Sequence, residues 1–494
     1  MNARESTDVV VIGSGPNGLA AAVTMARAGL GVHLYEAEDT LGGGARTLDL
    51  ELAGHLRHDV CSAVHPLASA SPFFAEFDLA ARGVDLTAPA VSYAQPLDGA
   101  QAGLAFRDLE HTADQLGADG RAWHKLFAPL LENLPAVLGL ALGDMRTVPP
   151  QVRTPGDLLT AISFGLRTLN QGSPAWNLPF TEEVAPALLT GVASHGVAPV
   201  RALAPAALGL VLGALAHAGG WTIPVGGSQV ITDALVADLQ AHGGIVHTAT
   251  PIHDYRQLPR ARAYFLDTAP TAAAGIWGDR LPARQAGRLH SFRHGNAVGK
   301  VDFVLSEPVP WAAGQVGDAA TVHVGGTRAE MARAEAQIAA GRHAPDPVVL
   351  VSDPTVADPA RGQEGLRPLW TYAHVPAGSS ADVTEAITAQ IERFAPGFRD
   401  VVVDSRCVPA DRMSQMNANY IGGDIGVGRL AVRRIVAGPA RGWNPYAIGI
   451  PGVYLCSSAT PPAPGVHGMC GQHAARWALS ERFSMKPPSL APAP

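Results

Sequence analysis

The chain has 494 residues, of which 47% are hydrophobic and 16% are charged, and its formal net charge is -7 at pH 7. This length indicates two or three domains with room to bury a large cofactor, and the composition excludes a disordered or fibrous protein. The negative charge, without any cluster of Lys and Arg, argues against nucleic acid as a partner.

A βαβ unit is predicted at the start of the chain. DVVVIG, from residue 8, is a strand of β-branched residues, and SGPNG follows as a tight turn. LAAAVTMARAG has the pattern of a buried helix, and GVHLYE gives a second strand.

Within this unit, Gly13, Gly15 and Gly18 form the GxGxxG pattern of a dinucleotide-binding turn. Gly13 is expected to make the turn, Gly15 to let backbone N–H groups approach a diphosphate, and Gly18 to let helix and strand pack closely. Glu36 ends the second strand, where a carboxylate accepts hydrogen bonds from ribose hydroxyls. The predicted dinucleotide contacts of this segment are Gly13, Ser14, Gly15, Pro16, Asn17, Gly18, Glu36 and Ala37.

A second glycine cluster, Gly42, Gly43 and Gly44, follows Glu36 closely. An NAD dehydrogenase needs no such cluster, whereas the longer FAD needs a second place where backbone can lie against it. Arg46 would add a cation toward phosphate or flavin. The pattern therefore favours non-covalently bound FAD.

The middle of the chain has helical patterns around 122–142 and 155–215 and no strand alternation. Its most apolar stretch, 202–216, is too short to span a bilayer and is predicted to be a buried helix. A surface that dips into a membrane to collect a greasy substrate is the alternative for this stretch.

After residue 221, the sequence returns to a pattern typical of the first domain: the helix ITDALVADLQAHGG is followed by the strands GIVHTATPI and ARAYFLDTA. A second mixed region comes next. Its expected strands are VGKVDFVL and PVVLVSD, and its expected helices cover 327–340 and 381–394.

The last elements are the strand GVYLCSSA, a loop rich in Pro and Gly, and the helix HGMCGQHAARWALSERF. The first N–H groups of such a helix carry partial positive charge. Aimed at the isoalloxazine ring, they would stabilise the reduced, anionic flavin.

Six further strings are spread over the chain: HDVCSAVHPL, IPVGGSQ, VGKVDFVLSEPVPW, VHVGGTRAEMARAE, LWTYAHVP and YLCSSATPPAPGVHGMCGQHAA. With the glycine clusters, they resemble the phytoene desaturase and monoamine oxidase superfamily of FAD-dependent oxidoreductases. Within it, the sequence is most similar to the branch that holds phytoene desaturase, carotenoid ketolases, retinol saturase and pyridine nucleotide-disulfide oxidoreductase domain-containing protein 2. The superfamily has GGR where this chain has a third glycine, so its arginine comes later, at Arg46.

The resemblance implies an α/β fold in which a discontinuous, Rossmann-like FAD-binding domain carries an inserted α+β substrate domain. The expected domains are residues 1–72, 222–290 and 445–484 for FAD, residues 73–221 and 291–444 for the substrate, and 485–494 as a flexible tail. It also implies flavin contacts from Ser458, Gly468 and Met469 and adenine or nearby contacts from Ile252, Thr268 and Ala269.

Candidate chemistry rests on few side chains. Lys300 resembles the lysine that amine oxidases place near flavin N5, although a salt-linked pair with Asp302 on the same strand face is the alternative. His65, His374 and His467 have a pKa that suits proton transfer, and a structural role is the alternative for each.

The four cysteines are Cys61, Cys407, Cys456 and Cys470, and they have no metal-ligand spacing, so no metal site is predicted. Such sparse cysteines are typical of a reduced, cytoplasmic protein. Cys456 and Cys470 lie near the predicted flavin loop, but no motif for covalent flavin attachment accompanies them.

The expected function is removal of a hydride from a hydrophobic, isoprenoid-like or carotenoid-like substrate. No second GxGxxG follows a strand, so oxygen or a quinone is the expected electron acceptor. A flavin amine oxidase and an FAD-stabilised binding or scaffold protein are the alternatives, and peripheral membrane contact is left open. The sequence makes no prediction of the oligomeric state.

Overall fold

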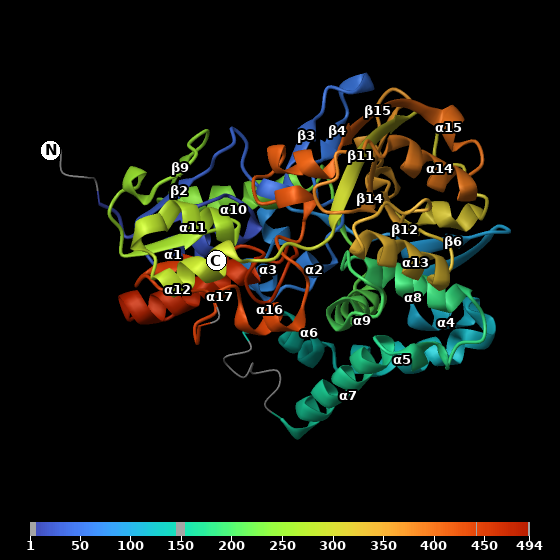
Figure 1. Ribbon diagram of the computed structural model, residues 1–494, viewed down its shortest axis with the longest axis horizontal. Helices are drawn as coiled ribbons and strands as arrows, with labels where there is room; N and C mark the ends of the chain where they lie inside the picture. The colour runs from blue at the N-terminus through green and yellow to red at the C-terminus, as the bar shows by residue number, and fades with distance from the viewer. Residues whose placement is uncertain (1–5, 145–153, 441, 493–494) are drawn as a thin grey trace.

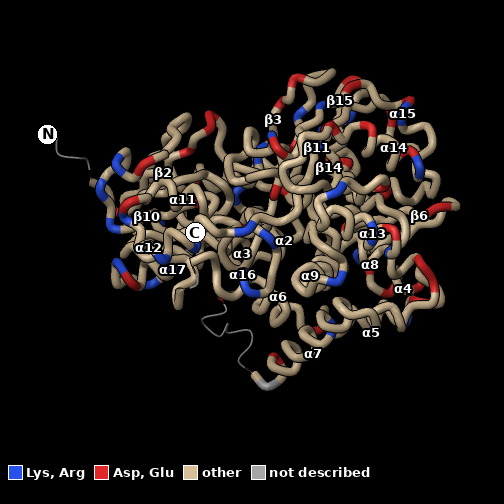
Figure 2. The backbone as a smooth tube through the Cα atoms, in the orientation of Figure 1, with Lys and Arg blue, Asp and Glu red and all other residues tan. Residues whose placement is uncertain are grey.

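The computed structural model describes residues 6–144, 154–440 and 442–492. Its strands form two large sheets that lie side by side, with a group of helices beneath the second sheet in the view of Figure 1. Lys and Arg are interspersed with Asp and Glu around the molecule (Figure 2).

The first sheet has five parallel strands in the order β16-β10-β1-β2-β9. The strands are β1 (Val9–Ile12), β2 (Val32–Tyr35), β9 (Ile245–His247), β10 (Ala263–Leu266) and β16 (Val453–Leu455). Three distant stretches of the chain therefore build one sheet. The prediction of a discontinuous Rossmann-like domain in an α/β protein is confirmed.

Helices cover both faces of this sheet. Alternate side chains of a strand point to opposite faces, so Val9 and Val11 join one hydrophobic core and Val10 and Ile12 join another. The first core includes α1 (Pro16–Arg27), α10 (Gln229–Ala241) and α17 (Met469–Ala478), and the second includes α11 (Pro270–Trp277) and α12 (Ala283–His290). Because helices cover both faces of the sheet, every position of β1 is buried, which accounts for its purely hydrophobic sequence.

The second sheet has seven strands in the order β15-β11-β14-β13-β12-β6-β7. Its pairs are antiparallel except for β12 with β6. The strands are β6 (Val91–Leu97), β7 (Gln101–Phe106), β11 (Ala297–Leu305), β12 (Thr321–Val324), β13 (Val349–Ser352), β14 (Arg367–Val375) and β15 (Val402–Val408). The helices on this side of the molecule are α13 (Arg328–Ala339), α14 (Thr384–Phe394) and α15 (Phe398–Val401).

Strands β6 and β7 lie before the predicted helical stretches 122–142 and 155–215, and they were not predicted. All seven residues of β6 are buried, including Ser92 and Gln95. A strand that is covered on both faces loses the alternation of polar and apolar residues by which strands are predicted.

The remaining middle segment is helical, as predicted. Its helices are α4 (Leu109–Gln115), α5 (Gly120–Glu132), α6 (Leu134–Leu142), α7 (Pro155–Gln171), α8 (Val184–Ser194) and α9 (Leu203–Ala218). The shorter elements of the fold are β3 (Thr47–Asp49), β4 (Arg57–Asp59), β5 (Leu86–Thr87), β8 (Ile223–Pro224), α2 (Pro66–Ser69), α3 (Pro72–Phe77) and α16 (Val432–Ala437).

Most of α9 is buried, so the prediction of a buried helix over 202–216 is confirmed. In contrast, α7 exposes a row of apolar side chains, namely Leu158, Leu159, Ile162, Leu166 and Leu169. Among the described helices none alone has the length and hydropathy of a membrane span, and one pair bent by 78°, Gly117–Glu132 with Leu134–Leu142, meets both criteria together. Membrane contact stays a prediction.

Residues 485–492, expected to be a flexible tail, make specific contacts with the rest of the chain. The side chain of Leu490 is buried, and its backbone N–H donates to Glu76 at 3.1 Å. Arg82 donates to the carbonyl of Leu490, and Arg27 donates to the carbonyl of Ala491 at 2.8 Å. These partners lie far away along the chain, so the proline content of the segment does not reveal them. Residues 493 and 494 lie outside the described residues.

Candidate functional site

The glycine turn between β1 and α1 has the geometry that the GxGxxG pattern predicts. Gly13 has a φ of +97°, which favours glycine. A Cβ added at Gly18 would lie 2.2 Å from the carbonyl oxygen of Gly13, so only glycine lets the helix approach the strand this closely. Gly15 caps α1, and Pro16 occupies its first turn. The N–H groups at the start of α1 are thus grouped at the carboxyl end of β1.

Glu36 lies at the end of β2, beside this turn. Its carboxylate accepts hydrogen bonds from the backbone N–H and the hydroxyl of Ser14, at 2.8 and 2.5 Å. The same hydroxyl accepts from the N–H of Gly42 at 3.0 Å. Ser14 therefore ties the acidic residue to the second glycine cluster.

The second glycine cluster packs directly on the first. A Cβ built on Gly43, whose φ is +56°, would lie 3.1 Å from the Cα of Gly15. Arg46 is buried and donates to the carbonyl of Gly43, to Thr40 and to the carbonyl of Met416. In this structure Arg46 therefore stabilises the loop of Gly42, Gly43 and Gly44 through hydrogen bonds.

Asp267, at the end of β10, faces the same turn and was not predicted. Its carboxylate accepts a hydrogen bond from the N–H of Gly18, and a Cβ on Gly15 would lie 2.5 Å from that carboxylate. Asn419 donates to the backbone carbonyl of Asp267 and accepts from the N–H of Ala269. The pKa of Asp267 is raised to about 7, chiefly by burial. The hydrogen bond from the Gly18 N–H lowers this pKa, and the nearby Glu36 carboxylate raises it.

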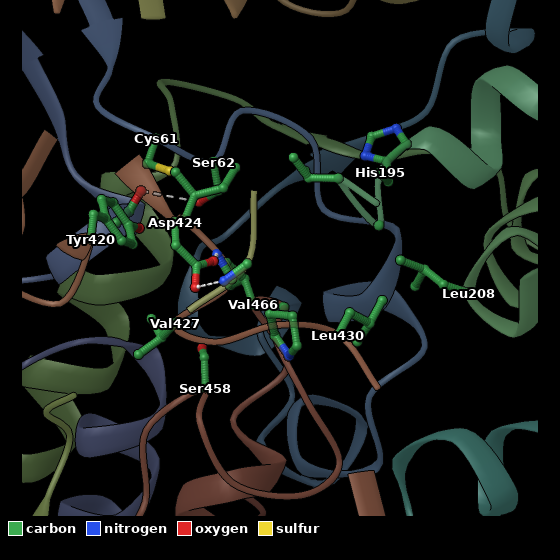
Figure 3. A pocket seen from close by; sticks show the side chains of 18 of the residues that line it. Cys61, Ser62, His195, Leu208, Tyr420, Asp424, Val427, Leu430, Ser458 and Val466 are labelled. Atoms are coloured by element: carbon green, nitrogen blue, oxygen red, sulfur yellow. Dashed lines mark hydrogen bonds between the residues drawn. The ribbon is translucent and has the colours of Figure 1, made fainter. Parts of the chain in front are cut away.

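A cavity of about 470 Å³ begins at the glycine turn and continues between the two sheets toward α8 and α9. Near the turn it is lined by Gly15, Pro16, Asn17, Gly44, Cys61, Tyr420 and Ser458. At the other end it is lined by His195, Val197, Leu208, Leu212, Trp221 and Leu430. Figure 3 shows this arrangement, with Cys61, Tyr420 and Ser458 on one side and His195 and Leu208 on the other.

The residues present fit a bound FAD. The side-chain oxygen of Asn17 is buried without a protein partner in a residue that lines the cavity, and the hydroxyl of Thr268 is likewise buried and unpartnered among the described residues. Such groups require a polar partner.

Some of the other predicted cofactor contacts lie near the glycine turn or the cavity, and others do not. The segment before Ile252 adjoins the acidic residue, because the N–H of Thr250 donates to the backbone carbonyl of Glu36 at 2.7 Å. Ala37 is exposed. Of the three contacts expected from the C-terminal segment, Ser458 lines the cavity, whereas Gly468 and Met469 are not among the described residues that line it.

Lys300, on β11, is buried and forms an ion pair with Asp302, as the alternative interpretation of its strand face predicts. His58 lies 3.5 Å from the second carboxylate oxygen of Asp302. Lys300 is not among the described residues that line the cavity, although Trp370, whose ring centre lies 5.9 Å from its Nζ, is.

His467 has both ring nitrogens engaged by backbone. Nε2 lies 3.0 Å from the carbonyl oxygen of Ala463, and Nδ1 accepts from the N–H of Met469. Burial lowers its pKa to about 4. This histidine therefore holds the loop before α17. The buried thiols of Cys456 and Cys470 have raised pKa values because burial disfavours the thiolate.

His65 keeps one ring nitrogen free. The hydroxyl of Ser228 donates to the carbonyl of Ser62 at 2.5 Å, so it accepts from Nε2 of His65, 2.7 Å away. Nδ1 is then an unprotonated acceptor, buried without a partner among the described residues. His65 lines the cavity, and burial lowers its pKa to about 4.

The segment 413–428 supplies further cavity residues that sequence reasoning missed, among them Asn417, Tyr420 and Asp424. Buried Arg434 fixes it by donating to the carbonyls of Gly426 and Ser458. The run NYIGGDIGVG, rich in glycine and without a helix or strand pattern, was the available signal in the sequence.

The sequence matches the model of the NAD(P)-binding Rossmann-like domain family over residues 11–77. It is 24% identical, over 96% of this chain and 97% of theirs, to uncharacterized proteins of Mycobacterium tuberculosis (strain ATCC 25618 / H37Rv) and of Mycobacterium bovis (strain ATCC BAA-935 / AF2122/97).

Solved structures share the fold over nearly the whole chain. A mutant of putrescine oxidase has a TM-score of 0.58 at 16% identity, with 97% of this chain and 99% of that chain covered. Cyclohexylamine oxidase from Brevibacterium oxydans has a TM-score of 0.57 at 14% identity, covering 96% and 98%. An oxidoreductase from Methanosarcina mazei has a TM-score of 0.56 at 15% identity, covering 96% and 100%.

Proposed function

We propose that this protein is an FAD-dependent oxidoreductase that removes a hydride from a hydrophobic, isoprenoid-like or carotenoid-like molecule. The single observation that carries the proposal is the continuity of one cavity from the dinucleotide turn at Gly15 to an apolar end at Leu208 and Leu212. The oxidoreductase fold of the solved relatives supports the same class of reaction.

Residues of both glycine clusters would hold the cofactor. The N–H groups of the turn around Gly15 suit a diphosphate, and Glu36 suits the adenosine ribose. Asn17 offers a buried acceptor oxygen to the part of the group that enters the cavity. Bound there, FAD supplies a two-electron acceptor for a hydride.

His65 is the best-placed group to take the proton that leaves the substrate. Desaturation breaks two C–H bonds, so that one hydrogen departs as hydride and the other as a proton while the carbon pair becomes a double bond. His65 is neutral at pH 7, and its Nδ1 lone pair is free. A weak base is sufficient because loss of a hydride makes the neighbouring proton strongly acidic. Of the three candidates Lys300, His467 and His65, the last is the one found among the described residues that line the cavity.

A flavin amine oxidase is the second candidate, favoured by the shared fold of putrescine oxidase and cyclohexylamine oxidase. The two candidates require different surroundings for the substrate, since an ammonium group needs a carboxylate or an aromatic face. A cytoplasmic location and oxygen or a quinone as the electron acceptor stay proposals.

The test is an anaerobic titration of the purified, flavin-loaded protein with a panel of polyenes and a panel of amines. Loss of the oxidised flavin absorbance with polyenes would support the proposal, and loss with amines alone would support the amine oxidase. No reduction by either panel would favour an FAD-stabilised binding protein, and a protein that neither contains nor takes up FAD would overturn all three.

His65→Gln tests the proton acceptor. We expect the rate of flavin reduction by the active substrate to fall about 100-fold, as is typical when a positioned base is lost. His467→Gln is the matched control and should leave this rate and its pH profile unchanged, provided that flavin content is equal. Equal rates for both variants would remove His65 from the mechanism.

A further inference from the structure

The end of the cavity remote from the glycine turn holds half-buried His195 and, behind it, buried His323 and His374, which the proposed reaction leaves unused. His195 follows α8 and lines the cavity, and its Nε2 lies 2.9 Å from Nε2 of His323 on β12. Its ring meets the ring of Trp221 edge to face, with centroids 5.2 Å apart. Figure 3 shows His195 on the same side of the cavity as Leu208.

The imidazoles of His195 and His323 at this end of the cavity are polar without being charged. Burial lowers the pKa of His195 to about 3 and that of His323 well below its ordinary value, and repulsion from neighbouring histidines lowers both further. Behind them His374 pairs with Glu335, a carboxylate that is buried and does not line the cavity. At neutral pH the group that meets a ligand here is therefore a neutral imidazole.

The bond between the two imidazoles also indicates which nitrogen carries the proton. One ring must donate and the other accept. Nδ1 of His323 is buried without a partner among the described residues, and an orphaned N–H is rarer than an orphaned acceptor. His323 thus donates from Nε2, and His195 carries its proton on Nδ1. That N–H has no acceptor among the described residues.

The carboxylates that line the cavity are not free to receive a cation. Asp424 accepts hydrogen bonds from His294 and from the N–H groups of Gly295, Gly426 and Gly428. Asp267 is bound at the glycine turn. An ammonium group at the remote end of the cavity would find the ring of Trp221 but no free carboxylate among the described lining residues, and burial of a charge without a counter-ion is strongly unfavourable.

We propose that the remote end of the cavity binds one neutral oxygen of an otherwise apolar substrate, a hydroxyl or a carbonyl, through the N–H of His195. The apolar body then lies along Leu208, Leu212 and Leu430, with its reacting carbons toward Gly44 and Ser458. This deepens the proposed function by naming the substrate class: a mono-oxygenated hydrophobic molecule, in preference to a pure hydrocarbon or an amine.

The test compares three probes of equal chain length, 1-octanol, octane and octylamine, in calorimetric titrations of the FAD-loaded protein at pH 7.5. We expect 1-octanol to bind more tightly than the other two. His195→Phe keeps an aromatic ring of similar size but no N–H, so the affinity for 1-octanol should fall about tenfold, in line with loss of one hydrogen bond, while octane binds as before.

His290→Phe, the same exchange at an exposed position of α12, is the control and should leave all three affinities unchanged. If His195→Phe does not fold, His195→Gln, which keeps an N–H donor, should fold and retain the preference for 1-octanol. Tighter binding of octylamine to the wild type, or equal losses for 1-octanol and octane in His195→Phe, would overturn the proposal.

Because calorimetry needs no turnover, the two proposals fail separately. Selective 1-octanol binding without flavin reduction by any substrate would leave the oxygen site intact and remove the proposed reaction. Flavin reduction without selective 1-octanol binding would support the proposed reaction and overturn the oxygen site.

Discussion

The carboxylate of Asp267 accepts a hydrogen bond of 2.9 Å from the backbone N–H of Gly18, inside the turn that suits a diphosphate. An ionised Asp267 would repel that diphosphate, so FAD binding favours the protonated acid. Its pKa of about 7, raised chiefly by burial, puts this titration near neutrality.

The first prediction is that FAD affinity falls as the pH rises through 7. With one proton linked to binding, the dissociation constant should rise up to about tenfold per pH unit above the pKa. Asp267→Asn should bind FAD with a flat profile. Quenching of flavin fluorescence between pH 5.5 and 8.5 measures both, and equal slopes for the two proteins would contradict the prediction.

The titration of Asp267 should also change the stability of the folded protein with pH. An unfolded aspartate titrates near 3.8, and the folded pKa is raised. The resulting stabilisation is therefore complete below pH 4 and is lost as the pH rises to about 7. In the cofactor-free protein, thermal midpoints of wild type and Asp267→Asn should diverge between these values, with the variant less affected by pH.

The second prediction concerns Gly44 and Tyr420. A Cβ on Gly44 would lie 2.1 Å from the hydroxyl oxygen of Tyr420. Gly44→Ala should lower the free energy of unfolding by about 1 to 3 kcal/mol through overpacking. Adding Tyr420→Phe removes that oxygen and should restore part of the loss. Urea denaturation of the four proteins in this cycle measures the coupling, and strict additivity would show that the two sites are independent.

The third prediction distinguishes two roles of Lys300, the ion pair with Asp302 and participation in flavin reoxidation. Lys300→Met leaves the buried carboxylate of Asp302 without its lysine partner, so it should cost about 3 to 5 kcal/mol of stability. Lys300→Met with Asp302→Leu should recover most of it. Stopped-flow reoxidation of the reduced double variant by oxygen should match the wild type, whereas a slow reaction would support the lysine role that the sequence predicts.

The fourth prediction concerns the C-terminal segment. Leu490→Ala removes a fully buried side chain and should cost about 2 to 3 kcal/mol in urea denaturation. Met485→Ala, at a position that is 36% exposed, is the control and should have little effect. Equal stability of the two variants would restore the interpretation of this segment as a loose tail.

The histidines illustrate why a candidate site cannot be assigned from residue type alone. In the sequence His467 is the better placed of the two bases His65 and His467, because it lies in the loop expected to abut the flavin. Yet of the two only His65 keeps a ring nitrogen without a partner among the described residues. His195, His323 and Asp267 carried no sequence signal, because each acquires its role from partners that lie far away along the chain.

The sequence by itself determined the βαβ unit, the glycine turn at Gly13 and the acidic Glu36, because these depend on residues within one local segment and on fixed backbone requirements. Only the tertiary structure decided that Gly43 lies against Gly15, that β6 belongs to the second sheet, and that the cavity reaches His195. The physical reason is that these relationships depend on contacts between segments far apart in the chain. Burial on both faces of a strand removes the periodic pattern from its sequence, and packing determines which polar atoms are left without a hydrogen-bond partner.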